Sequence, residues 1–358
     1  MKKTSKLLFA FVLVTLILGS VACGSGGDSA AGGTATEDSA GGESGTVYEW
    51  KIGSIYSDPA TVQEFNSFGL AQQKFVDLVE EKTNGQVKIT PFYNSVLGGD
   101  QELFQQVRLG ELEVFFGNAL SGVDARFGAL GIPYLYKDYD QAAQLYGSPD
   151  GEIFKMFKSW VEEHDVHLLA SATGAFRGFA NVKKPVVTPD DLEGLKVRVY
   201  QDPVVPIFWG DKSTPTQLAF SEVHSALETG TVDAIEFQAT SILLRHFDEV
   251  LNYYTDINWQ LTPGGNFIVS NKAWNELPDD LKEKVEEAAW EAANYFLEVQ
   301  LADEEKALEE LEKRGMEVYR LSDEERQVWI DYARSLDDQI REAIGAEVFD
   351  QVMQAAGH

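Results

Sequence analysis

Two pieces of sequence decide the fold: GLKVRVY at residues 194–200 and FSEVHSALETGTVDAIEF at residues 220–237. In the first piece apolar residues occupy every second position, which predicts a short strand with Arg198 on the face opposite the core. The second piece has apolar residues at i, i+3 and i+4 between a serine and a Thr-Gly pair, a pattern typical of a capped helix. Residues 232–237 predict another strand. Because ligands of open α/β sheets bind beside strand ends, we expect a binding site here.

Similar patterns extend in both directions along the chain. Residues 48–55 alternate apolar and polar side chains, and residues 64–82 have apolar side chains near helical spacing before an Asn-Gly pair. Asp100 is expected to cap the next helix. This alternation of strands and helices predicts a parallel sheet with helices on its faces. The predicted elements are strands at residues 48–55, 86–92, 113–116, 167–172, 266–270 and 316–321, and helices at residues 64–82, 100–110 and 140–164.

A long helix is predicted to begin at Leu277–Asp280, where proline and two acidic residues suit a first turn. Its pattern continues to about Arg314, and Gly315 is expected to end it. At about 1.5 Å per residue this segment would span roughly 50 Å, which exceeds the size of one lobe of about 130 residues. We therefore expect one helix, or two abutting helices, lying across two lobes. A capping box at residues 322–325 predicts further helices.

The chain is long and strongly acidic. Its 358 residues include 58 Asp and Glu against 29 Lys and Arg, a formal net charge of −29. The length suggests two domains, and the charge excludes proteins that bind nucleic acid or anionic lipid through a basic surface. An anionic ligand would have to be attracted locally, by a few cations. Arginines are scarce between residues 47 and 263, where the chain has Arg108, Arg126, Arg177, Arg198 and Arg245.

The N-terminus has the pattern of a secretory leader. Three lysines flank the start of an apolar run, Leu7–Leu18, which is too short to span a bilayer comfortably. Small residues then lead to Cys23, the single cysteine, so no intrachain disulfide can form. This arrangement resembles a bacterial lipoprotein leader, in which residues 1–22 are removed and Cys23 carries the lipid. The alternative is an ordinary signal peptide followed by an incidental cysteine. Residues 23–46 are rich in Gly, Ala and Ser and predict a flexible linker.

The pieces between residues 194 and 237 resemble the signature of the DctP-type extracytoplasmic solute receptors of tripartite ATP-independent periplasmic (TRAP) transporters. Those receptors have a G-L-K-hydrophobic-R-hydrophobic strand and then F-S-E-V-x-x-A-L-x-T-G-x-V-D-G, and here Ala234 stands in place of the last glycine. Further matches to the family are KTNG at 82–85, LGGD at 97–100 and IPYLY at 132–136. The resemblance covers residues 48–350.

The resemblance implies an α/β fold of two lobes, like that of periplasmic binding proteins, with a hinge-bending cleft and a long helix that spans both lobes. We place lobe I at residues 47–174 and about 264–303, and lobe II at residues 175–263 and about 304–358. The implied function is that of a monomeric receptor that captures an organic acid without covalent chemistry. It would lie in the periplasm or at the outer face of the cell membrane and deliver the acid to the small and large permease subunits. A sensory co-receptor and an extracytoplasmic enzyme on the same scaffold are the alternatives.

The resemblance implies a role for two of the arginines. Arg198 matches the residue with which the family binds a carboxylate, for which the planar guanidinium offers two parallel donors. From its strand position alone, Arg198 would be a solvated surface residue. Arg177, in the small-residue run 174–181, matches the second pocket arginine of several family members. Its alternative role is an ion pair with a nearby acid where the lobes meet.

Four further residues are predicted to line the same site. Where the family often has Q-E-N, this chain has Glu236-Phe237, so Phe237 would provide an apolar wall, or simply belong to the core. A second subgroup of the family has E-W and holds a cation with a keto acid, which makes Glu236 a weak candidate ligand for Ca²⁺ or Na⁺. Gln217 and Trp209 are a polar and an aromatic candidate. No cofactor is expected, and the five histidines show no metal-binding spacing.

Overall fold

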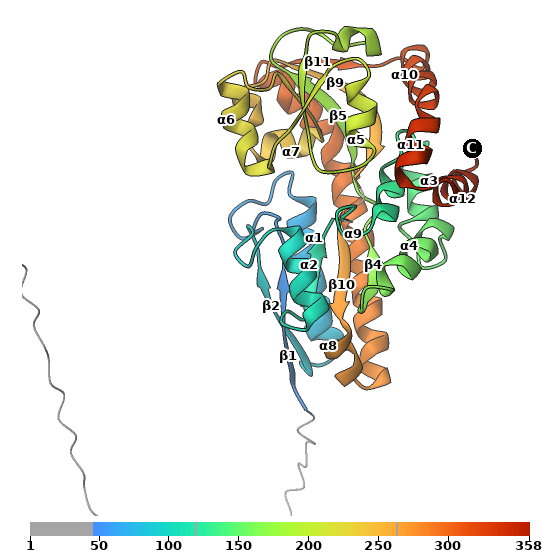
Figure 1. Ribbon diagram of the computed structural model, residues 1–358. Helices are drawn as coiled ribbons and strands as arrows, with labels where there is room; N and C mark the ends of the chain where they lie inside the picture. The colour runs from blue at the N-terminus through green and yellow to red at the C-terminus, as the bar shows by residue number, and fades with distance from the viewer. Residues whose placement is uncertain (1–45, 119, 263) are drawn as a thin grey trace, which may run out of the picture. The chain divides into compact units, whose positions relative to one another are not determined.

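The computed structural model describes residues 46–118, 120–262 and 264–358. These residues form two β-sheets with helices around them (Figure 1). The first sheet has the strand order β2-β1-β3-β10-β4 and the second the order β11-β9-β5-β8-β6-β7. The first sheet comprises β1 (Tyr48–Gly53), β2 (Val87–Phe92), β3 (Val114–Gly117), β4 (Val166–Ser171) and β10 (Asn266–Ser270). The second comprises β5 (Phe176–Asn181), β6 (Lys196–Val199), β7 (Thr214–Gln217), β8 (Ala234–Phe237), β9 (Tyr253–Leu261) and β11 (Glu317–Arg320).

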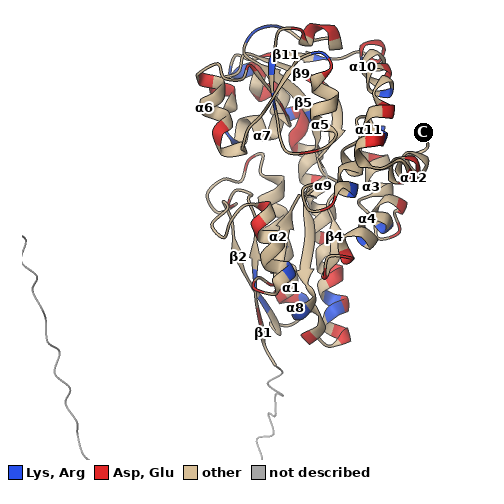
Figure 2. Ribbon diagram, in the orientation of Figure 1, with Lys and Arg blue, Asp and Glu red and all other residues tan. Residues whose placement is uncertain are grey.

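The helices follow the strands in both halves of the chain. Figure 2 shows acidic residues on many of these helices. The α-helices are α1 (Ser67–Lys82), α2 (Asp100–Leu109), α3 (Tyr139–Leu145), α4 (Glu152–Glu162), α5 (Val205–Gly210), α6 (Val223–Glu228), α7 (Ala239–Leu244), α8 (Asn271–Glu276), α9 (Asp279–Lys313), α10 (Asp323–Ser335), α11 (Asp337–Ile344) and α12 (Ala346–Ala356). The 3₁₀ helices are η1 (Ala125–Gly131), η2 (Pro189–Leu192), η3 (Phe220–Glu222) and η4 (Phe247–Glu249). The helix predicted at residues 140–164 is thus two helices.

Both sheets are mixed rather than purely parallel. Strand β1 pairs in parallel with β2 and β3, as predicted, but β10 lies antiparallel between β3 and β4. In the second sheet β6 is parallel to β7 and β8, whereas β5 is antiparallel to β8 and β9. The reason is that the chain leaves the first sheet through β4 and returns to it through β10, so these two strands run in opposite directions.

Two crossing segments therefore join the sheets side by side. One runs from β4 to β5 and the other from β9 to β10, and they hydrogen-bond to each other through Ala172 N to Gly265 O and Thr262 N to Ala175 O, both at 3.0 Å. Gly174 has φ +91°, and a Cβ atom there would lie 2.0 Å from the carbonyl oxygen of Thr262. A side chain at residue 174 would separate the segments, so glycine is required for their close approach.

Helix α9 confirms the prediction of one long helix. It has 35 residues, with Asp279 and Asp280 in its first turn. Its N-terminal part packs through a small-residue stripe that includes Ala288 and Ala292 on α1 and the first sheet, and its C-terminal part packs through Leu308 and Leu311 in the core beside the second sheet. Figure 1 shows α9 running alongside both sheets. The helix thus belongs to both halves of the molecule.

The C-terminal helices do not follow the predicted division of the chain into two lobes. The strands of each sheet fall within the residue ranges given above for lobes I and II. Helices α11 and α12, however, contact η1, and α12 also contacts α4, elements that those ranges assign to the other lobe. Their buried residues belong to one core cluster with residues from both ranges. The domain boundaries remain a prediction, and the two sheets are the firmer division of the fold.

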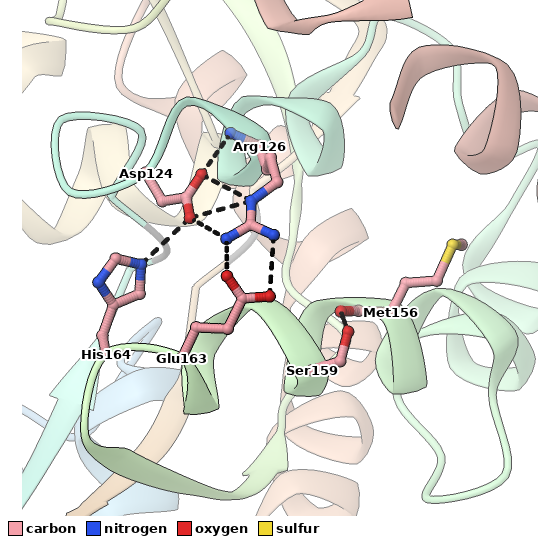
Figure 3. A network of polar contacts seen from close by, with 6 residues as sticks. All are labelled: Asp124, Arg126, Met156, Ser159, Glu163 and His164. Atoms are coloured by element: carbon pink, nitrogen blue, oxygen red, sulfur yellow. Dashed lines mark hydrogen bonds and ion pairs between the residues drawn. The ribbon is translucent and has the colours of Figure 1, made fainter. Parts of the chain in front are cut away.

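A cluster of charged side chains fixes η1 to the end of α4 (Figure 3). Arg126 donates from Nη2 to Asp124 Oδ2 and to Glu163 Oε2, each at 2.6 Å, and from Nη1 to Glu163 Oε1 at 3.1 Å. His164 Nε2 lies 3.1 Å from Asp124 Oδ2. Partial burial by itself would raise the pKa of Asp124, but the hydrogen bonds from Arg126 and His164 outweigh it and lower that pKa to about 2.

We expect Asp124→Asn to destabilise the protein at neutral pH. Because the folded-state pKa lies below the unfolded value, the carboxylate contributes roughly 2 kcal/mol above about pH 4, and this contribution is lost as the pH falls towards about 2. Urea denaturation at pH 7 and pH 3 measures the difference. Asp350→Asn is the control, because the Asp350–Arg341 pair is half-exposed and should contribute little. Equal stabilities of wild type and Asp124→Asn at pH 7 would contradict the prediction.

Candidate functional site

A cavity of about 340 Å³ lies where the parallel strands of both sheets end. From the first sheet it is lined by residues that follow β1 and β3, such as Tyr56 and Asn118. From the second it is lined by residues of β5, β6 and β8 and by Tyr200, which follows β6. The C-terminal ends of parallel strands meet at one edge of a sheet, which is why side chains distant in sequence gather here. The cavity therefore lies where the alternation at residues 194–200 predicts a binding site.

Arg198 reaches the cavity from β6. Its neighbours Val197 and Val199 are 0% and 2% exposed on the core side, so the alternating strand turns the arginine to the other face. The side chain is 4% exposed and donates from Nε to the carbonyl oxygen of Leu218 at 3.3 Å. Among the described residues, nothing accepts a hydrogen bond from Nη1 or Nη2. Burial lowers the pKa of Arg198, an effect that Glu236 partly opposes.

Two aromatic rings flank this guanidinium. The Cζ atom of Arg198 lies 5.7 Å from the ring centroid of Tyr200 and 5.9 Å from that of Phe220. Cations are attracted to the faces of aromatic rings, and such contacts hold the planar group in one orientation. The result is a buried cation that lines the cavity and whose two terminal nitrogens have no acceptor among the described residues, an arrangement suited to binding a carboxylate with two parallel hydrogen bonds.

Arg177 also lines the cavity, but a carboxylate of the protein already binds it. Strands β5 and β8 are antiparallel neighbours, and Arg177 Nε donates to Glu236 Oε2, with a further bond of 2.8 Å from Nη2 to the Glu236 carbonyl oxygen. Nη1 donates to Thr262 Oγ1 at 3.2 Å. Burial by itself would lower the pKa of Arg177, and Glu236 reverses this and raises it. Arg177 thus makes the internal ion pair given above as its alternative role, while its Cζ lies 5.2 Å from the ring of Phe237.

Two carboxylates, those of Asp202 and Asp100, also line the cavity. Asp202 accepts hydrogen bonds from the backbone N–H groups of Val204 and Val205, at 2.8 and 3.1 Å, and from Ser121 Oγ at 3.0 Å. Asp100 accepts from Asn118 Nδ2 at 2.6 Å. Burial raises the pKa of Asp100 to about 7, and the Asn118 hydrogen bond only partly offsets this. At neutral pH Asp100 is therefore partly protonated and can donate as well as accept.

A family of known proteins matches most of the chain. The family model of the bacterial extracellular solute-binding proteins, family 7 (DctP), matches residues 60–343. The chain belongs to this family. It is 31% identical over 297 residues to the C4-dicarboxylate-binding periplasmic protein DctP of Rhodobacter capsulatus, an alignment that covers 80% of this chain and 86% of the relative. The family resemblance seen in the sequence is confirmed.

Solved structures show the same fold. A TRAP periplasmic solute-binding protein from Ochrobactrum anthropi, with its C-terminus bound in the ligand-binding pocket, superposes with a TM-score of 0.77 at 29% identity over 87% of this chain and 95% of its own. The sugar acid binding protein DctPAm from Advenella mimigardefordensis, solved in complex with galactonate, gives a TM-score of 0.78 at 25% identity over 87% and 98%. The family 7 protein therefore has the two-lobed α/β fold of the TRAP solute-binding proteins, as predicted.

Three of the six predicted ligand-binding residues of this family 7 protein line the cavity: Arg198, Arg177 and Phe237. Glu236 is fully buried behind Arg177. The other two residues lie away from the cavity. Trp209 is 0% exposed in the core, with its ring centroid 4.9 Å from that of Phe179. Gln217 ends the edge strand β7, is exposed, and does not line the cavity.

Other lining residues were not predicted as site residues from the sequence. Tyr56 and Phe68, which stack with their centroids 4.3 Å apart, come from the turn after β1 and the start of α1. Asp100 is the first residue of α2 and Gly99 is its N-cap, one residue earlier than predicted. Arg245 follows α7 and also lines the cavity. The scarcity of arginine between residues 47 and 263 was the single hint that Arg245 belongs to the site. No local sequence pattern marks a residue that reaches a cavity from a distant helix.

The family 7 protein has no cluster of three His, Cys, Asp or Glu side chains suited to a metal ion within the described residues. Glu236, the weak metal candidate, accepts from Arg177 instead. Cys23, the predicted leader and residues 23–45 of the predicted linker lie outside the described residues. Among the residues that the structure describes, no helix is long and apolar enough to cross a membrane.

Proposed function

We propose that the protein binds a small organic acid outside the cytoplasm and delivers it to the small and large membrane subunits of a TRAP permease. The observation that carries the proposal is Arg198, a buried cation that lines the cavity and whose terminal nitrogens have no protein acceptor among the described residues. A carboxylate would satisfy both nitrogens and neutralise the charge. The names of the two relatives above, a C4-dicarboxylate-binding and a sugar acid binding protein, support the same class of ligand.

The proposal gives the neighbouring residues distinct tasks. Arg198 binds the carboxylate, and Arg177, fixed by Glu236, presents its cationic edge to a second polar group of the ligand. Phe237 contacts the apolar part of the ligand beside it. The paired crossing segments that join the sheets serve as the hinge, so that the cavity walls contributed by the two sheets close on the acid.

The remaining expectations belong to the same proposal. The protein acts as a receptor that releases its ligand unchanged, and it functions as a monomer. Cys23 carries a lipid that anchors the chain in the periplasm or at the outer face of the cell membrane. The sequence around that cysteine supports the anchor, and the family of solute-binding proteins supports the receptor role.

A thermal-shift comparison of acids with their primary amides tests the proposal. We expect at least one small organic acid to raise the melting temperature, because ligand at 100 times its dissociation constant adds about 2.7 kcal/mol to the stability of the folded state. The amide of that acid has the same shape without the charge and should have little effect. Equal shifts from acid and amide, or no shift from any acid, would contradict the proposal.

A further inference from the structure

Arg245 stands out among the cavity residues because it has no defined task in the fold. It follows α7, is partly buried and lines the cavity. Its hydrogen bond runs from Nη2 to the carbonyl oxygen of Ile55 at 3.4 Å, longer than the usual range of 2.7–3.2 Å for such bonds. No carboxylate of the described residues pairs with it. Burial lowers the pKa of Arg245, in the direction expected for a cation without a counterion.

An unpaired arginine is unusual in this chain, in which acids outnumber bases two to one. Within the described ranges, the arginines that pair with Asp or Glu are Arg126, Arg177, Arg314, Arg320, Arg334 and Arg341. Arg326 donates to two backbone carbonyls and Arg108 is exposed. Arg198 and Arg245 are the remaining two in the described part of the chain, and both line the cavity. A partly buried cation costs desolvation free energy unless something pairs with it.

The two unpaired guanidinium groups lie near the same aromatic ring. The Cζ atoms of Arg198 and Arg245 are 5.9 and 5.7 Å from the centroid of Phe220. One small molecule in the cavity can therefore reach both. The surface close to them is apolar, since Phe220 lies 5.5 Å from the ring of Phe237, and Leu244 also lines the cavity. A ligand held at both ends would place its middle against this apolar wall.

We propose that Arg245 is a second anion-binding residue, which selects acids with two negatively charged groups separated by an apolar segment. The inference rests on the proposed function, because it takes Arg198 as the site of the first carboxylate. Arg177 is not available for the same task to the same degree, since Glu236 already neutralises it. Two free cations and one wall of aromatic rings thus match two anionic ends and an apolar middle.

Matched pairs of acids test this inference by isothermal titration calorimetry. The probes are the α,ω-dicarboxylates from succinate to suberate, the straight-chain monocarboxylates of equal length, and terephthalate against 4-methylbenzoate. We expect the best-fitting diacid to bind roughly 10- to 100-fold more tightly than its monoacid, as one additional charge-assisted hydrogen bond would provide. The chain length of the diacid that binds most tightly also indicates the separation of the two cations.

Variants assign the preference to Arg245. Arg245→Gln should lower the affinity for the diacid towards that of the monoacid and change monoacid binding far less, and Arg245→Lys should restore part of the diacid preference. Arg108→Gln, which removes the same charge from an exposed position on α2, is the control and should leave both affinities unchanged. A residue that merely supported the fold would weaken both ligands equally.

The possible outcomes distinguish a failure of this inference from a failure of the proposed function. If monoacids and diacids bind equally and both depend on Arg198, the proposed function stands and the role of Arg245 is wrong. The same conclusion follows if Arg245→Gln weakens both ligands to the same extent. If no acid binds, or if binding is indifferent to Arg198, the proposed function fails and this inference fails with it.

Discussion

Arg198→Met is expected to lower the affinity for the acid by roughly 100-fold or more, because it removes one partner of a buried, doubly hydrogen-bonded ion pair. Methionine keeps much of the apolar stem that packs beside Tyr200 and Phe220, so the loss would measure the guanidinium itself. The ligand-free variant should be at least as stable as the wild type, since an unpaired buried cation is costly. Calorimetry with the acid chosen by the thermal-shift screen and urea denaturation without ligand measure the two effects.

Two comparison variants make the result specific. Arg198→Lys retains the charge without the planar pair of donors, so its affinity should lie between those of wild type and Arg198→Met. Arg108→Met removes one positive charge from an exposed site and should leave the affinity unchanged. If Arg198→Met and Arg108→Met bind the acid alike, the carboxylate is bound elsewhere and the proposed site is wrong.

The elements that the sequence predicted well are those whose signals are local. The alternation around Arg198 matches β6, and the apolar stripe at residues 223–227 matches α6. The acidic first turn and Gly315 bracket α9. Each of these patterns depends on residues a few positions apart, so periodicity and caps are enough to reveal them.

The sequence analysis missed three strands, β5, β7 and β9. β7 reads TPTQ, an edge strand with a proline and largely exposed side chains, which lacks the alternation of a half-buried strand. β9 does alternate at residues 257–261, where Asn258 and Gln260 separate apolar residues, so a local strand signal was present there and was not used. The antiparallel insertion of β10 follows from the path of the chain between the sheets, and no stretch of sequence records that path.

The candidate site was less predictable the farther apart its interacting residues lie in the sequence. Arg198 could be predicted from the pattern of its own strand together with the family resemblance. The ion-pair partner of Arg177 is Glu236, which is 59 residues away in the sequence. The sequence therefore left open whether Arg177 forms an ion pair or contacts the ligand. Trp209 and Gln217 were placed by their nearness in sequence to the strand ends, but Trp209 lies on α5 and is buried in the core, and Gln217 ends the edge strand β7.

Glu236→Gln is expected to destabilise the protein by about 3–5 kcal/mol, because it removes one partner of a buried ion pair. The substitution keeps the size of the side chain but leaves Arg177, which is 5% exposed, without its counterion. Arg177 would retain its hydrogen bonds to Thr262 and to the backbone oxygen of residue 236, but those groups carry no charge. Urea denaturation of the ligand-free protein at pH 7 measures the loss.

The double variant Arg177→Met/Glu236→Leu distinguishes a lost ion pair from a disturbed core. Replacing a buried pair by apolar side chains of similar size is often neutral, so the double variant should recover most of the stability that Glu236→Gln loses. If Glu236→Gln is as stable as the wild type, Glu236 is already protonated in the folded protein and Arg177 carries an uncompensated charge. Arg177 would then be a third arginine of the cavity without a counterion, although its Nη1 and Nη2 atoms would still donate to Thr262 and to the backbone oxygen of residue 236.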